Sequence, residues 1–145
     1  MEKLSDKNFN AVQVGKMSDL SNYVLQLAPG VEIKGKVFLG EELQLTGSNI
    51  SFQSFPVGGE SGFYHTHKSH EEIYIFLSGH GEFQVDNKSF TVEEGSVVRV
   101  SPEGKRSVRN IGETPLVMCC LQYKSNSFTD EDSRDGVILN DPVKW

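Results

Sequence analysis

All four histidines of the chain lie within residues 59–81. His65 and His67 are two residues apart, so on a β-strand both imidazoles point to the same face. Glu72 follows five residues after His67, and its carboxylate reaches the imidazoles if a strand resumes there after a polar turn. Two neutral imidazoles and one carboxylate suit Zn, Fe(II), Mn or Ni and leave positions open for water or substrate. The pattern therefore predicts a divalent transition metal site.

A neighbouring carboxylate, that of Glu71, competes with Glu72 for this role. Strand parity favours Glu72, because alternation puts it on the same face as Tyr74 and Phe76 and turns Glu71 away. The alternative interpretation is a metal-free polar network, in which the two histidines bond to the carboxylate inside a barrel.

The spacing of these residues resembles a known family motif. Gly59, five residues, His65-x-His67, four residues, Glu72, six residues and Gly79 are similar to the first signature motif of the cupins. The cupins are a superfamily of small β-barrels. The resemblance implies an all-β, cupin-like double-stranded β-helix, also called a jelly-roll barrel, with metal held by the two histidines and the glutamate.

A second cupin motif is present in altered form. Gly95 and Asn110 keep the expected separation, whereas Pro102 and Gly104 are each displaced by one position. Arg106 stands where the family usually has a third histidine ligand. The two motifs span residues 59–110, and the departure bears on the metal site and not on the fold.

Arg106 changes the chemistry of the site, because a guanidinium stays protonated and cannot ligate a cation. Either three protein ligands hold the metal and Arg106 binds a carboxylate or phosphate of a substrate, or the metal is lost and Arg106 pairs with Glu72. A third interpretation lets Arg106 extend to solvent at the barrel mouth. Arg99, Lys105 and Arg109 lie close in sequence and indicate a small anionic ligand.

Several side chains on the predicted inner face are candidates for contact with that ligand. Gln53 and Tyr74 are the two that we assign to ligand binding, Tyr74 because a buried hydroxyl needs a partner. Phe63, Phe76 and Phe83 complete an apolar lining that suits a small molecule with an apolar body and an acidic head. As core residues of a barrel they need no such explanation.

The elements that must position these residues are short strands separated by turns every eight to twelve residues, a pattern typical of a sandwich or barrel. We prefer the barrel because a histidine pair needs a shielded interior. Strands are expected at 23–27, 31–39, 42–46, 49–55, around His65 and His67, and at 72–77, 82–85, 89–92, 96–100, 106–110 and 116–123.

The chain is expected to divide into three segments. Residues 1–22 form an N-terminal arm, loosely attached or folded as a short helix, residues 23–124 form the barrel, and residues 125–145 form a C-terminal tail that packs on the barrel or on a partner subunit. Strands that are apolar on both faces, and the habit of the family to pair barrels, favour a homodimer.

Composition restricts the partners. The chain has 145 residues, a net charge of −6 and a pI near 5.2, which excludes nucleic acid and anionic membrane surfaces as partners. No apolar run approaches the ~18 residues needed to span a bilayer, and the first ten residues are too polar for a signal peptide, so we expect a cytoplasmic protein. Cys119 and Cys120 are adjacent and are expected to be small apolar strand residues on opposite faces.

Two functions are consistent with this sequence. The first is a metal-dependent enzyme of the dioxygenase, decarboxylase or isomerase type that acts on a small anionic molecule. The alternative is a non-catalytic barrel that binds or senses a small ligand, with or without metal. A barrel that keeps only the fold, without activity, is a third interpretation.

Overall fold

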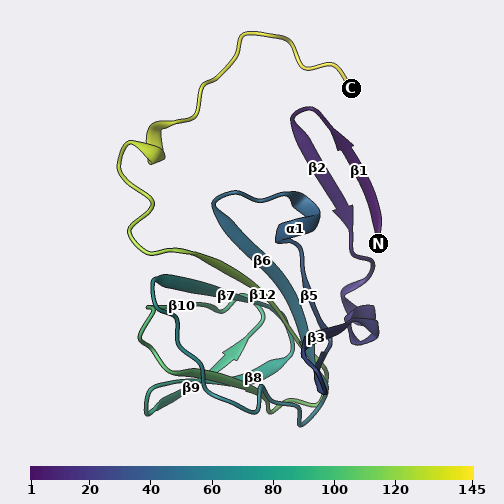
Figure 1. The fold of residues 1–145 in the computed structure, drawn as a ribbon, viewed down its shortest axis with the longest axis vertical. Coiled ribbons are helices and arrows are strands. Elements are labelled where there is room, and N and C mark those ends of the chain that lie inside the picture. The colour runs from purple at the N-terminus through teal and green to yellow at the C-terminus, as the bar shows by residue number, and fades with distance from the viewer.

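Two antiparallel sheets face each other across a buried core in a computed structural model that describes residues 1–145 (Figure 1). The larger sheet has the strand order β10-β7-β12-β6-β5, and the smaller has the order β11-β8-β9. The strands are β5 (Lys36–Phe38), β6 (Ser48–Phe55), β7 (His70–Ser78), β8 (His80–Val85), β9 (Lys88–Glu93), β10 (Val97–Val100), β11 (Arg106–Asn110) and β12 (Leu116–Lys124). The prediction of an all-β jelly-roll barrel is confirmed.

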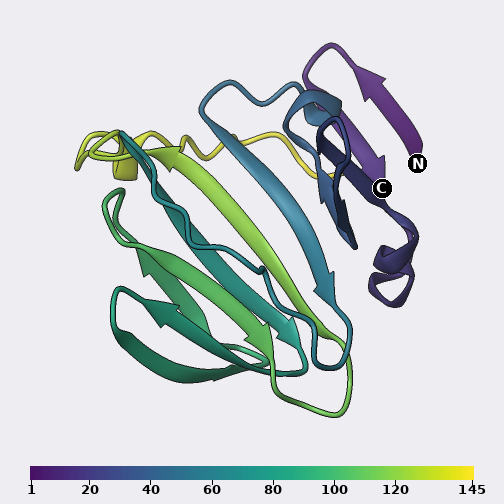
Figure 2. The same ribbon diagram turned by 60° about the horizontal axis from the view of Figure 1, so that its bottom comes forward.

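The long strands β6, β12 and β7 run side by side through the larger sheet, as Figure 2 shows. Alternation decides which side chains they turn inward. On β7, Glu72, Tyr74 and Phe76 are buried between the sheets, whereas Ile73 and Ile75 are half-buried on the outer side. This alternation places the acidic residue of the predicted site on the inner face.

The core is divided into two apolar clusters. The larger lies between the sheets and joins Tyr74 and Phe76 of one sheet to Phe83 of the other, with the ring centroids of Tyr74 and Phe83 4.9 Å apart. The smaller cluster lies on the outside of the larger sheet, where the 3-10 helix η1 (Met17–Asn22) inserts Leu20 against Val37. The first cluster holds the barrel closed, and the second attaches the N-terminal segment to it.

The histidine pair lies on an extended connection and not on a regular strand, so the expected strand around His65 and His67 is a wrong prediction. Residues 56–69 follow β11 through two isolated bridges, Glu60 with Arg109 and His65 with Arg106. Gly58, which has φ of 73°, is among the residues that interrupt strand geometry here. The two imidazoles nevertheless point into the barrel, because the bridge with β11 fixes the backbone at His65.

The strand expected at 42–46 is also wrong. This segment contains the short helix α1 (Gly40–Leu43), which ends at Gln44 in the left-handed conformation with φ of 54°. The side-chain oxygen of Asn49 accepts a hydrogen bond from the backbone N–H of Gly40 at 3.1 Å, which stabilises the start of the turn. Local hydrogen bonding outweighs the alternating pattern here.

Both ends of the chain extend beyond the barrel (Figure 1). The N-terminal arm is a hairpin of β1 (Glu2–Asp6) and β2 (Phe9–Gln13), where we expected a loose arm or a helix. A second ribbon, β3 (Val24–Ala28) with β4 (Val31–Lys34), precedes β5. The tail contains the 3-10 helix η2 (Asp132–Arg134) and is exposed from residue 126 onward. None of the helices has the length and hydropathy of a membrane span.

Candidate metal centre

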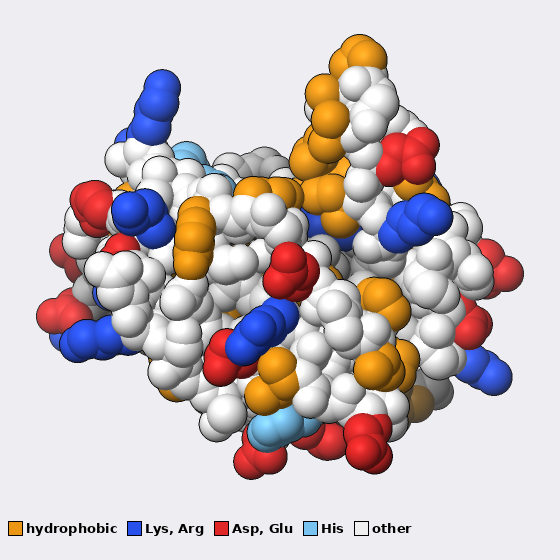
Figure 3. All heavy atoms as spheres, turned by 90° about the horizontal axis from the view of Figure 1, so that it is seen from below, with side chains coloured by type: hydrophobic (Ala, Val, Ile, Leu, Met, Phe, Trp, Pro, Cys, Tyr) orange, Lys and Arg blue, Asp and Glu red, His pale blue; other side chains and the backbone are white.

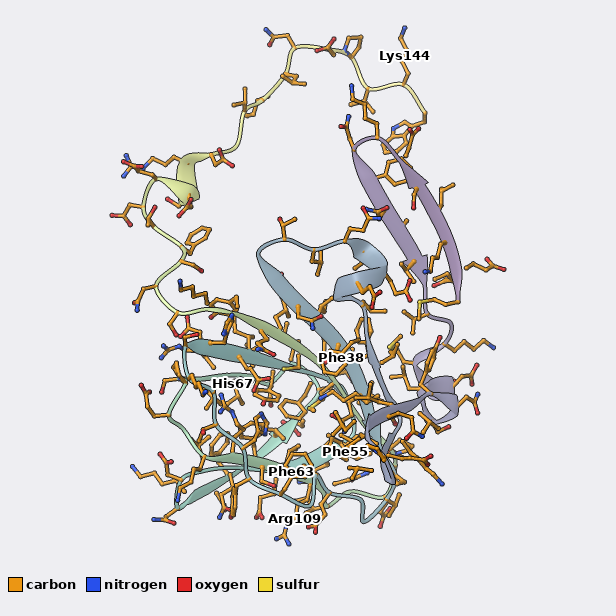
Figure 4. All side chains as sticks on the ribbon, viewed as in Figure 1. Phe38, Phe55, Phe63, His67, Arg109 and Lys144 are labelled. Carbon is orange, nitrogen blue, oxygen red and sulfur yellow. The ribbon has the colours of Figure 1, made fainter.

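Three side chains converge inside the barrel. The nitrogen and oxygen atoms that His65, His67 and Glu72 offer all lie within 4.8 Å of one another. Nε2 of His65 lies 3.3 Å from Oε2 of Glu72, and Nε2 of His67 lies 3.3 Å from Oε1. Each carboxylate oxygen therefore faces one imidazole. Figure 4 shows His67 among the side chains that fill the space between the sheets.

Glu72 is the one buried carboxylate of the chain, and it is 7% exposed. Besides the imidazoles, it accepts a hydrogen bond from the hydroxyl of Tyr74 on its own strand. Nε of Arg106 lies 3.3 Å from Oε2, and Sγ of Cys120 lies 3.5 Å from Oε1. As parity predicts, Glu71 points outward, where it accepts a hydrogen bond from Nε of Arg99 at 2.6 Å.

These contacts keep Glu72 ionised. Burial by itself raises the pKa of a carboxyl group, but hydrogen bonds from His65 and Tyr74 and the charges of His65 and His67 outweigh it and bring the pKa of Glu72 from 4.5 to about 2. Burial and the charge of Glu72 both raise the pKa of Tyr74, which therefore remains a proton donor. The site thus presents an anion held by fixed donors.

The donor set fits a divalent metal. Nε2 of His67 is buried and has no hydrogen-bond partner, although buried polar atoms are normally paired. Burial lowers the pKa of His67, the charges of Arg106 and His65 lower it further, and Glu72 opposes them. The imidazole is therefore neutral near pH 7, which is the form that binds metal. A cation between the imidazoles and the carboxylate would satisfy this free nitrogen.

Arg106 is 1% exposed and lies on β11 beside the site. Its guanidinium donates to backbone carbonyls of the preceding loop, among them Gly104 at 2.9 Å and Ser101 at 3.4 Å, and also to the carbonyl of His65 at 3.2 Å. Arg106 therefore does not extend to solvent, and it contacts Glu72 as one of our interpretations expects. Arg106 therefore holds the histidine segment and the carboxylate of Glu72 in position relative to each other.

A cavity of about 550 Å³ adjoins the three ligands. Gln53 and Tyr74, the two residues assigned to ligand contact, are 6% and 4% exposed and lie in its wall. Its apolar lining includes Phe55, Phe83 and Met118. Figure 4 places Phe55 and Phe63 toward the lower part of the barrel. The cavity thus combines one polar end with an apolar body.

One cavity residue was absent from our sequence-based expectations. Lys36 of β5 is half-buried and lies in the cavity wall with His65 and Glu72. Burial lowers the pKa of Lys36, and the charge of Glu72 opposes this effect. The nearby cations that the sequence did single out are engaged elsewhere: Arg109 pairs with Glu82 at 2.8 Å on the exposed surface.

Asn110 shows why the second motif ends as it does. Its side-chain nitrogen donates to the carbonyls of Phe55 at 3.0 Å, Pro56 at 3.1 Å and Thr114 at 2.8 Å, and its oxygen accepts from the N–H of Gly112 at 2.9 Å. One buried amide therefore ties the start of the β6–β7 connection to the β11–β12 connection. Its role is structural.

Comparison with known proteins agrees with this architecture. The family model described as a cupin domain matches residues 51–122. A cupin protein from Bacteroides fragilis is 30% identical, with a TM-score of 0.75 over 92% of this chain and 99% of the other. A predicted oxalate decarboxylase from Thermotoga maritima is 23% identical, with a TM-score of 0.58 over 70% of this chain and 90% of the other, a likeness of fold.

The curated proteins include an uncharacterized protein of Methanocaldococcus jannaschii that is 35% identical over 77 residues, 53% of this chain. The match spans 61% of that relative's length. Together with the two sheets and the converging histidines and glutamate, the similarity over nearly the full length of the Bacteroides fragilis protein shows that this chain belongs to the cupin superfamily.

Proposed function

We propose that this protein binds a divalent transition metal through His65, His67 and Glu72, and a small anionic molecule in the adjoining cavity. The observation that carries the metal site is the buried, unpartnered Nε2 of His67, 3.3 Å from a carboxylate that is ionised at all ordinary pH values. Zn, Fe, Mn and Ni all accept this donor set, so supply and geometry select among them.

A bound metal would supply Lewis acidity to an oxygen-bearing ligand. The chain supplies the rest: Tyr74 and Arg106 fix the orientation of Glu72, which in turn fixes which lone pair faces the imidazoles. The expected contact of Arg106 with the anionic ligand itself stays a prediction, supported by its place in the cavity wall. An enzyme of the dioxygenase, decarboxylase or isomerase type is the activity that we propose for this site.

A non-catalytic ligand-binding or sensing barrel is the second candidate, and one observation favours it. Apart from the proposed ligands, no buried carboxylate or imidazole of the cavity is placed as a general base, because Glu32 and Glu60, which also line it, are exposed. Burial raises the pKa of both the Tyr74 hydroxyl and the Cys120 thiol, and the charge of Glu72 raises both further, so neither accepts a proton near pH 7. Turnover assays on the metal-loaded protein separate the two candidates.

Metal analysis tests the proposed site. Protein purified without an affinity tag from metal-replete growth is expected to carry a transition metal in a ratio near one per chain. His67→Ala should lose most of it, because three protein ligands become two. His80→Ala is the matched control, since His80 is exposed on β8 outside the ligand group, and should keep the metal. A metal-free wild type would contradict the proposal.

We also propose that two chains pair as a homodimer. The β3–β4 ribbon carries exposed apolar side chains, with Val24 48%, Leu27 53% and Val31 49% exposed. Figure 3 shows hydrophobic side chains gathered on a projection at the upper right, the side on which Figure 1 draws this ribbon. Burial of such a surface against a second copy is favourable.

Sedimentation velocity tests the pairing. The wild type is expected to sediment as a dimer at micromolar concentration, and Leu27→Asp should shift it toward monomer. Lys88→Asp, at the exposed start of β9 in the smaller sheet, is the control that should leave the dimer intact. A monomeric wild type would remove the proposal.

A further inference from the structure

Lys36 is a cation that the chain leaves without a counter-ion inside the barrel. It lies on β5 opposite Gln53 of β6, so its side chain shares the inward face of the larger sheet with that buried residue. It lines the main cavity, and it also lines the smaller hollow that His65, His67 and Glu72 border. The side chain of Lys36 makes no hydrogen bond or ion pair, and its ammonium nitrogen Nζ lies 4.9 Å from the ring centroid of Phe38.

The arginines near the site are already engaged by the protein, and Lys34, which also lines the main cavity, is exposed to solvent. Arg106 donates to backbone carbonyls and faces Glu72, while Arg99 and Arg109 pair with Glu71 and Glu82 on the outer surface. Lys36 differs from these three arginines because it forms no ion pair with the chain while its side chain lines the cavity.

An ammonium group removed from water without a partner is costly, and contact with one aromatic ring offsets only part of the cost. Consistent with this, burial lowers the pKa of Lys36. A divalent metal at the proposed centre would add further positive charge, so Lys36, Arg106 and the metal would be opposed by the single buried carboxylate of Glu72. The exposed residues Lys34, Glu32 and Glu60 also line the cavity, and with them counted a net of two positive charges remains, which favours a ligand with two negative charges.

We propose that Lys36 is the anion-recognition residue of the cavity and that the ligand is a small dianionic acid. One carboxylate or phosphate group pairs with Lys36, and the second acidic group faces the centre formed by His65, His67 and Glu72. The short carbon body lies against the apolar wall that includes Phe83 and Met118. The placement of the second acidic group at the metal centre rests on the proposed function, whereas the pairing of the first group with Lys36 does not.

Calorimetric titration of the full chain tests the assignment. Succinate and phosphoglycolate serve as diacid probes without and with a phosphate, with two and with between about two and three negative charges near pH 7, and butyrate is the monoanionic comparison. Each is titrated into Zn²⁺-loaded protein and into protein freed of metal by chelation. Lys36→Met keeps the apolar stem and removes the charge, and Lys88→Met, at an exposed turn, is the matched control.

The wild type should bind at least one dianion more tightly than butyrate. Lys36→Met should weaken that binding on the order of tenfold to 100-fold, the usual effect of losing a charged hydrogen bond. Lys88→Met should stay within about twofold, as expected for an exposed charge. Which dianion binds more tightly identifies the head group that Lys36 receives. Circular dichroism and Zn²⁺ stoichiometry establish that Lys36→Met is folded and its metal centre intact.

The two proposals fail in different ways. The chain could bind no metal and the wild type could still bind a dianion more tightly than Lys36→Met does. In that case the proposed metal centre is wrong and the role of Lys36 is supported. If metal binds and Lys36→Met binds both dianions as the wild type does, the role of Lys36 is overturned. Absence of any dianion binding by the metal-loaded and metal-free wild type also overturns it.

Discussion

The two walls of the cavity treat charge in opposite ways. On the wall formed by β7 and β11, Glu72 and Arg106 are almost fully buried, and each contacts several groups of the chain itself. On the wall formed by β5, Lys36 has no charged partner. Charges that hold the architecture are compensated within the chain, whereas Lys36, to which we assign ligand recognition, has no charged partner there. Substitutions on the two walls should therefore differ in their effect on stability.

The largest effect is expected from Arg106→Met. This change removes the guanidinium donor from the carbonyl of Gly104, one of the two donors to the carbonyl of His65, and the cation beside Glu72, so the free energy of unfolding should fall by about 3 to 5 kcal/mol. Arg109→Met, which breaks an exposed ion pair with Glu82, should cost less than about 1 kcal/mol. Denaturant unfolding measures both. Equal costs would erase the distinction between the buried and the surface arginine.

The next largest effect on stability is expected from acid, which acts on Glu72 in the wall formed by β7 and β11. The pKa of Glu72 is about 2 in the folded chain against an ordinary 4.5, so ionised Glu72 stabilises the fold above pH 4.5 and this contribution is lost as the pH falls toward 2. For metal-free protein the loss amounts to about 3 kcal/mol, because each tenfold change in proton affinity corresponds to about 1.4 kcal/mol. Unfolding curves between pH 6 and 2 measure it. Glu72→Gln should flatten this part of the profile, and an unchanged slope would contradict the lowered pKa.

A smaller effect is expected from Tyr74→Phe. The change removes one hydrogen bond to Glu72 while the ring stays packed against Phe83, so the free energy of unfolding should fall by about 1 to 2 kcal/mol. Because this donor lowers the pKa of Glu72, the acid transition should also move to higher pH. Tyr64→Phe, whose hydroxyl bonds to Gln84 on the exposed surface, is the control. A neutral Tyr74→Phe would show that the hydroxyl is not needed to hold the carboxylate.

The smallest effect on stability is expected from Lys36→Met. Removal of a charge that has no partner should change the free energy of unfolding by less than about 1 kcal/mol, with stabilisation as the favoured sign. Thermal unfolding of metal-free protein measures this. A fall in the free energy of unfolding as large as that of Arg106→Met would mean that Lys36, like Arg106, stabilises the fold through contacts within the chain.

Much of the fold could be predicted because it depends on local patterns. Alternation on β7 separates Glu72 from Glu71, and the turn signals around residues 78–81 and 86–87 set the ends of β7, β8 and β9. The convergence of His65, His67 and Glu72 followed from their spacing even though the histidines lie on an irregular segment. The prediction succeeded because these side chains are long enough to meet although the segment is not a regular strand.

Other features could not be predicted, because they depend on distant parts of the chain. Lys34 and Lys36 look equivalent in an alternating segment. Gly35 lies between them with φ of 76°, separates β4 from β5, and packs against the backbone of Ser54. Both lysines line the main cavity, but Lys34 before this break is exposed whereas Lys36 after it is half-buried. The partners of Arg106 are loop carbonyls, which carry no signature in the sequence.

The central claim is that the two imidazoles and the carboxylate hold one metal ion inside the barrel. A crystal structure of untagged protein, with anomalous data collected at the absorption edge of the bound metal, tests it most directly. We predict a single strong anomalous peak about 2.0 to 2.2 Å from Nε2 of His65, Nε2 of His67 and an oxygen of Glu72. A strong peak elsewhere on the chain, or no peak at this position in crystals grown with excess metal, would contradict the account.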